Sequence, residues 1–236
     1  MAGHKKEYVK GEQLHSRIKV IAGIILFGSL WGMLEATLGG ILHYVGIVNP
    51  GPVMASTGFS ILAFAVAIYG KPWIAPYIGL VAASEKFLGF IIFPWSSWGK
   101  IIRPATGIFL ESLLFGAVTA IMWNEYREKA GSKVLCTSLA SYLGMFAYGF
   151  LGWTIFRSGI GANRNILVML KDIGFSATLT FMLSAFLVPA GHWLGNRVRD
   201  YDERMALKDP AFYYSMATIA SVWCWIVAFI TTVKGP

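Results

Sequence analysis

Apolar runs of membrane-spanning length recur along this chain and constrain its fold more than any other feature. An α-helix needs roughly 20 apolar residues to cross about 30 Å of hydrocarbon. Of the 236 residues, 56% are hydrophobic and only 14% are charged. A soluble domain of this length carries more charge, and a β-barrel shows short alternating segments instead. The sequence therefore predicts an all-α fold, a polytopic membrane helical bundle.

Seven spans account for the apolar runs and for the polar segments between them. The second and third are separated only by Lys71 and Pro72, which predicts a tight helical hairpin. The predicted spans are Ile18–Leu42, Val53–Gly70, Trp73–Phe93, Ile101–Trp123, Val134–Phe156, Ile166–Ala190 and Ala211–Val233. The first run is long and lacks a small-residue cleavage site at its end, which favours a retained span over a signal peptide.

The spans divide the chain into four parts. These are a cytoplasmic N-terminal tail (1–17), a six-helix membrane core (18–190), a charged cytoplasmic linker (191–210) and an additional C-terminal transmembrane helix (211–236). Lys and Arg gather in the loops of one side, which by the positive-inside rule is cytoplasmic. We expect an integral protein of the cytoplasmic (inner) membrane of a prokaryote, with a cytoplasmic N-terminus. The net charge of +8 then reflects topology, and no nucleic-acid partner is expected.

The first predicted span carries small residues on one face. Gly28, Gly32, Ala36 and Gly40 lie four residues apart within FGSLWGMLEATLGGILH. Residues at this spacing share one helix face. Because that face has almost no side chains, another backbone can approach closely, as in small-xxx-small contacts between membrane helices. We call these four residues the small-residue strip and predict that a partner subunit docks there.

Three carboxylates lie inside predicted spans at matching depth. Glu35, Glu85 and Glu111 each lie roughly 10–15 Å below the outer boundary, at about 1.5 Å of helix rise per residue. Lys86 lies at the same depth, where pairing with Glu35 or Glu111 is geometrically available. Charged groups in lipid are costly and face protein, water or a ligand. The four residues indicate either an internal ion-pair network or an outward-opening pocket for a polar or cationic small molecule; a proton relay is a third interpretation.

Two further polar features accompany these charges. His43 follows the small-residue strip at the outer end of the first span, where it either lines the pocket or anchors the helix at the interface. With Glu35, Glu85, Lys86 and Glu111 it completes the candidate substrate-binding residues. In the sixth span, a polar strip repeats every four residues and indicates either hydrogen bonds between helices or one wall of the same cavity. Its members are Asp172, Ser176, Thr180 and Ser184.

The chain contains no signature of a known catalytic chemistry. No P-loop, nucleophile elbow, HExxH motif or dinucleotide fingerprint occurs. Cys136 and Cys224 lie in different apolar runs, and no His, Cys and carboxylate residues have structural-metal spacing. We therefore expect no enzyme activity, no cofactor and no metal site. Any energy source must come from a partner or from a gradient.

The blocks GSLWGMLEATLGGILH, GLVAASEKFLGF and IIRPATGIFLESLLFG lie between Ile24 and Trp123. They resemble the substrate-binding S components of energy-coupling factor transporters. The resemblance implies a six-helix module that binds a micronutrient from outside, and Glu35, Glu85 and Glu111 would face the ligand by analogy. It also implies that the small-residue strip docks on a membrane coupling protein, with two cytoplasmic ATPases supplying energy. The charged inner segment and the seventh span depart from this pattern, because family members end inside.

Two functional hypotheses follow from these features. The first is a membrane-embedded substrate-capture subunit for uptake of a small nutrient or ion, powered by partner subunits. The alternative is a non-catalytic accessory or scaffold subunit of a larger membrane complex, respiratory or photosynthetic. The alternative rests on the added span and on the aromatic-rich tail around Trp223 and Trp225. Both hypotheses require membrane lipid and other membrane subunits as partners.

Overall fold

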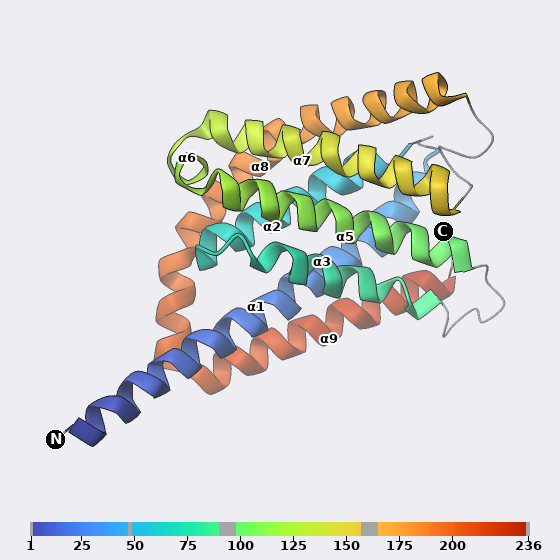
Figure 1. Cartoon of the computed structure of the whole chain (residues 1–236). Helices are drawn as coiled ribbons and strands as arrows, with labels where there is room; N and C mark the ends of the chain where they lie inside the picture. The colour runs from blue at the N-terminus through green and yellow to red at the C-terminus, as the bar shows by residue number, and fades with distance from the viewer. Residues whose placement is uncertain (1, 47–48, 90–97, 157–164, 235–236) are drawn as a thin grey trace.

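The computed structural model describes residues 2–46, 49–89, 98–156 and 165–234, and every regular element in these ranges is helical (Figure 1). The elements are α1 (Ala2–Tyr44), α2 (Gly51–Tyr69), α3 (Ile74–Glu85), α5 (Trp98–Ile121), α6 (Trp123–Glu128), α7 (Ala130–Leu151), the π-helical turn η1 (Gly152–Phe156), α8 (Ile166–Lys208) and α9 (Pro210–Lys234). Among these, α6 and η1 are short connecting or terminal pieces. The long helices run side by side as a bundle (Figure 1).

Six of the described helices are long and apolar enough to cross a membrane. These segments are Ser16–Leu42, Gly51–Tyr69, Ile101–Ile121, Ala130–Leu151, Ile166–Lys208 and Pro210–Val233. The predicted helical membrane bundle is confirmed at this level. The predicted third span, Trp73–Phe93, differs: α3 ends at Glu85 after 12 residues, which rise about 18 Å. The residues of that prediction beyond Gly89 lie outside the described residues.

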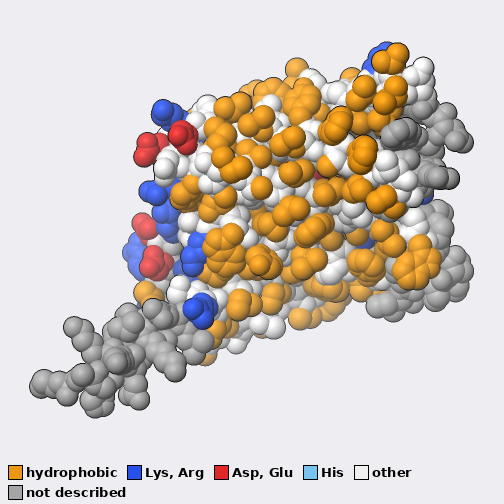
Figure 2. Space-filling model, viewed as in Figure 1, with side chains coloured by type: hydrophobic (Ala, Val, Ile, Leu, Met, Phe, Trp, Pro, Cys, Tyr) orange, Lys and Arg blue, Asp and Glu red, His pale blue; other side chains and the backbone are white. Residues whose placement is uncertain are grey.

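The charged side chains gather at one end of the bundle. Figure 1 places α6, the turn between α2 and α3, and the junction of α8 with α9 at the end nearest the N-terminus. Lys, Arg, Asp and Glu side chains cluster at this end in Figure 2, whereas hydrophobic side chains cover the face of the bundle shown there. We call it the charged end. This asymmetry matches the predicted distribution of Lys and Arg, and its cytoplasmic location remains a prediction.

Helix α8 continues well beyond the predicted sixth span. It contains 43 residues and runs through most of the segment predicted as a linker before it ends at Lys208. Proline restricts the residue before it to non-helical conformations, and Asp209 precedes Pro210 with φ −142° and ψ 82°. The last turns of α8 cross the charged end of the bundle (Figure 1). Pro189 lies inside α8, and an internal proline is a common cause of a bend in a helix.

Small and hydroxyl-bearing residues join α2 to α8. The Asn49 side-chain amide, which precedes α2, donates to Ser176 Oγ at 3.0 Å, and Ser56 Oγ donates to the Thr180 carbonyl at 3.1 Å. A Cβ built at Gly191 would lie 2.5 Å from the Ser60 carbonyl oxygen, so the two backbones approach closely there. The interpretation of the polar strip as a source of interhelical hydrogen bonds is confirmed for the Ser176 side chain, whereas Thr180 accepts through its backbone carbonyl and its hydroxyl bonds within α8.

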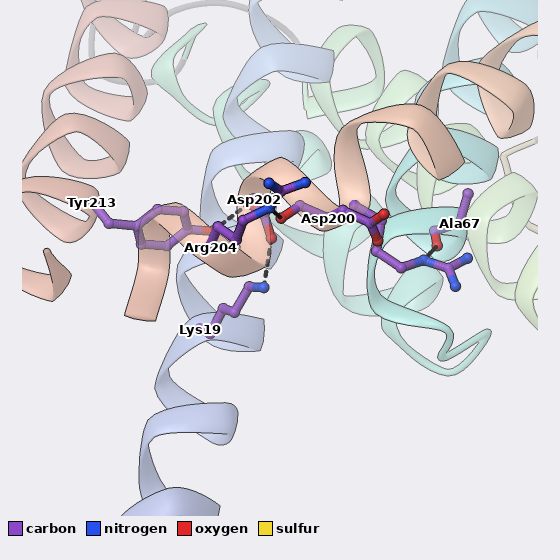
Figure 3. A network of polar contacts seen from close by, with 7 residues as sticks. Lys19, Ala67, Asp200, Asp202, Arg204 and Tyr213 are labelled. Carbon is purple, nitrogen blue, oxygen red and sulfur yellow. Dashed lines mark hydrogen bonds and ion pairs between the residues drawn. The ribbon is translucent and has the colours of Figure 1, made fainter. Parts of the chain in front are cut away.

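The end of α8 joins three other helices through a polar network (Figure 3). Asp202 receives Lys19 Nζ of α1 at 2.7 Å and the Tyr213 hydroxyl of α9 at 2.8 Å. Arg199 Nε donates to the Ala67 carbonyl of α2 at 2.9 Å. Because these partners come from α1, α2 and α9, the charged segment after the sixth span is a structural clamp at this end of the bundle.

Candidate functional site

Glu35 and Lys86 form an ion pair between α1 and the residue that follows α3. Lys86 Nζ lies 3.2 Å from Glu35 Oε2, and the two side chains are 20% and 13% exposed. From their matching depth in the predicted spans, Lys86 could pair with either Glu35 or Glu111, and the structure shows the pair with Glu35. A buried carboxylate in lipid needs such a partner, so the pair stabilises the approach of α1 to the end of α3.

Glu85, the residue before Lys86, lies against Gly32 of α1, one helical turn before Glu35. Its side chain is buried, with the residue 5% exposed, and a Cβ built at Gly32 would lie 2.5 Å from its carboxyl carbon. Neither carboxyl oxygen has a hydrogen-bond partner among the described residues. Buried polar groups without partners are rare and often mark functional positions. A side chain at Gly32 would therefore displace this carboxyl group.

Glu111 of α5 completes the group. A Cβ built at Gly144 of α7 would lie 3.7 Å from its Cγ, which places the side chain between α5 and α7. Its carboxyl group interacts electrostatically with that of Glu35. The structure therefore brings Glu35, Glu85, Glu111 and Lys86 into one region, and we call these four residues the charged cluster.

Two residues that the sequence reasoning did not assign to the site extend the charged cluster. Tyr148 of α7 lies across Gly107, where a Cβ would be 3.6 Å from its ring. Its hydroxyl interacts electrostatically with both Arg103 and Glu111. Arg103, Gly107 and Glu111 are four residues apart and share one face of α5. That spacing is the sequence signal that identifies this face, whereas nothing in the apolar run around Tyr148 distinguishes it.

We predicted that a partner subunit docks on the small-residue strip. Over half of the strip, α3 of the same chain lies there instead. A Cβ at Gly28 would lie 2.8 Å from the Ile78 carbonyl oxygen and would also meet Val81, and Gly32 lies against Glu85. These contacts come from α3 of the same chain, so Gly28 and Gly32 are not free to receive a partner subunit in this structure. The prediction of docking is left to Ala36 and Gly40, which are half-buried.

Two further features of the sequence concern His43 and the grouping of possible metal ligands. His43 lies in the last turn of α1, but its side chain lies outside what the structure describes. In the described part of the chain, no three His, Cys, Asp or Glu side chains are grouped to hold a metal ion.

The comparisons with known proteins do not identify a relative. No protein-family model, curated protein or solved structure matches this chain. The likeness to transporter S components rests on the residues of this chain alone, and a functional conclusion must come from the geometry of the charged cluster.

Proposed function

We propose that this chain is a membrane-embedded subunit that captures a small polar or cationic nutrient or ion from the outer side. The observation that carries the proposal is the convergence of Glu35, Glu85, Glu111 and Lys86 from three segments of the bundle. Ionisable residues inside a membrane are rare, face the bundle interior or a water-filled cavity, and are by default candidates for a ligand or ion site. The cluster lies in the half of the bundle away from the charged end, as expected of a site loaded from outside.

The charge balance of the cluster favours a cationic or hydrogen-bond-donating ligand. Lys86 pairs with Glu35, so the ammonium group is already used. Glu85 retains two carboxyl oxygens without described partners, and carboxylate oxygens accept hydrogen bonds. A ligand with N–H or O–H donors would meet this unfilled capacity.

Energy for uptake must come from other subunits on this proposal. The chain has no nucleotide-binding motif, and the resemblance to S components suggests a membrane coupling protein with two ATPases. Docking of that coupling protein is proposed at Ala36 and Gly40, since α3 covers Gly28 and Gly32.

Purification of the tagged chain from its source cells in mild detergent tests this proposal. A membrane coupling subunit and ATP-hydrolysing subunits are expected to co-purify in constant ratio, and Ala36→Leu is expected to reduce their recovery. Ala190→Leu, at an exposed position of α8, provides the matched control for general effects of substitution. Recovery of redox subunits instead would overturn the transport proposal and support the scaffold alternative.

A further inference from the structure

A groove between α1 and α9 opens near the charged end of the bundle. Its volume is about 230 Å³, and its walls include Ile18, Ile21 and Ile25 of α1 and Tyr214, Thr218 and Ser221 of α9. All of these residues lie in segments long and apolar enough to cross the membrane. The groove is separate from the charged cluster and plays no part in the proposed capture of a nutrient.

The walls of the groove suit an apolar occupant. Three isoleucines form the α1 side. On the α9 side, Thr218 Oγ1 donates to the Tyr214 carbonyl and Ser221 Oγ donates to the Ala217 carbonyl, each at 2.8 Å. The hydroxyl protons of Thr218 and Ser221 are therefore bonded within α9, and the wall exposes mainly carbon atoms.

A polar contact lies beyond each end of the groove. Both helices begin at the charged end (Figure 1), so they run parallel. Deeper in the membrane, Trp225 Nε1 donates to Ser29 Oγ at 3.0 Å and joins the two helices. At the mouth, the pair of Lys19 with Asp202 joins α1 to α8 at 2.7 Å. The lined stretch from Ile18 to Ile25 rises about 10 Å, enough for part of a lipid acyl chain.

Arg17 marks the mouth with positive charge. It is exposed and lies one turn before Ile21 on the same face of α1. Among the side chains that the structure describes, which in α1 begin at Ser16, no acidic one forms an ion pair with Arg17. The nearby charge of Asp202 is met by Lys19 and by the Tyr213 hydroxyl, so it does not oppose an anion at Arg17.

We propose that this groove binds one anionic phospholipid, with an acyl chain between α1 and α9 and the phosphate on Arg17. Lipid is the surrounding solvent of these helices, and an Arg at a membrane boundary attracts anionic headgroups. The apolar walls explain why the acyl chain is retained, and the positive charge of Arg17 explains why an anionic headgroup is preferred.

Native mass spectrometry of the purified chain tests the proposal, with phosphatidylglycerol and phosphatidylcholine of identical acyl chains as probes. We expect one phosphatidylglycerol to remain bound through detergent exchange. Ala217→Phe fills the groove and is expected to lower retention of both lipids at least tenfold, whereas Arg17→Gln is expected to abolish the preference for phosphatidylglycerol.

Ala190→Phe, at an exposed position of α8, and Arg197→Gln, whose guanidinium lies over Trp193, are the matched controls and should behave as wild type. Unchanged lipid retention in Ala217→Phe, or an unchanged headgroup preference in Arg17→Gln, would overturn the proposal. A chain that forms dimers and retains no lipid would also overturn it, because the groove would then receive a second copy. Since Arg17 is exposed, its variant tests the headgroup even if Ala217→Phe fails to fold.

Discussion

Lys86 Nζ lies 3.2 Å from Glu35 Oε2, and this ion pair joins the end of α3 to α1. One turn earlier on α1, Gly32 lies directly against the carboxyl group of Glu85. The two adjacent residues of the α3 end are thus held on α1 by a charge contact and by a close backbone approach. Both contacts lie within the region that we propose captures a ligand.

Removal of the Lys86 charge should destabilise the fold. Lys86→Gln leaves Glu35 without its partner, and breaking a buried pair costs about 3–5 kcal/mol. Because the side chains are 20% and 13% exposed, we expect a loss of at least about 2 kcal/mol in the free energy of unfolding. Denaturant unfolding in detergent micelles measures it.

The double variant Glu35→Gln with Lys86→Gln provides the control for that experiment. It removes both charges, so its loss of stability should be smaller than the sum of the two single losses. Strictly additive losses would show that the two side chains do not interact in the membrane.

Gly32 and Gly39 should respond oppositely to the same substitution. Gly32→Ala places a methyl group against the Glu85 carboxyl group, and such overpacking costs about 1–3 kcal/mol. A Cβ at Gly39 meets nothing within 4 Å, so Gly39→Ala should be neutral or stabilise the helix by up to about 1 kcal/mol. Unfolding midpoints of the two variants check this, and equal effects would contradict the assigned contact of α1 with α3.

The helical bundle can largely be predicted from the sequence, because the hydrocarbon of the membrane restricts which backbone structures can form. A run of about 20 apolar residues must form a helix, since its backbone polar groups have no other partners in hydrocarbon. That Lys86 can pair with Glu35 or with Glu111 also followed, because depth along a helix is set by residue count. The coordinates add the choice of Glu35 over Glu111 as the partner of Lys86.

The features that the sequence leaves undetermined depend on which helices are neighbours. The small-residue strip indicates that a backbone approaches α1 but not whose backbone, and Val81 and Glu85 of α3 occupy half of it. Charged residues after Ala190 indicated a linker, yet they continue α8 as a helix because Asp202 and Arg199 find partners on other helices. Tertiary partners of this kind leave no periodic signal in the sequence.

Asp202 should matter far more than the neighbouring Asp200. Asp202→Asn weakens contacts to Lys19 and Tyr213, and hydrogen bonds to charged groups contribute about 1.5–3 kcal/mol. Asp200 has an exposed side chain, so Asp200→Asn should change stability by less than about 0.5 kcal/mol. We expect trypsin to cleave the end of α8 faster only in Asp202→Asn; equal cleavage of both variants would contradict the clamp.

The proposed orientation can be tested with engineered cysteines. Cys136 and Cys224 are buried, so they should contribute little background labelling. In intact cells, a membrane-impermeant maleimide is expected to label Tyr44→Cys, which replaces a residue 83% exposed at the end opposite the charged end. Asn124→Cys, at an exposed position of α6, should be labelled only after the cells are opened. The reverse pattern would place the charged end outside.

The most direct test of the charged cluster as a capture site is to identify what the protein carries. The wild-type chain and the variants Glu85→Gln, Glu111→Gln and Asp200→Asn are purified from the source cells, denatured and analysed for released non-lipid small molecules by mass spectrometry. We predict one discrete species from the wild type and from Asp200→Asn, at least tenfold less abundant in both Glu variants although their unfolding midpoints remain close to wild type. The same small molecules in all four samples, or none in the wild type, would contradict the account.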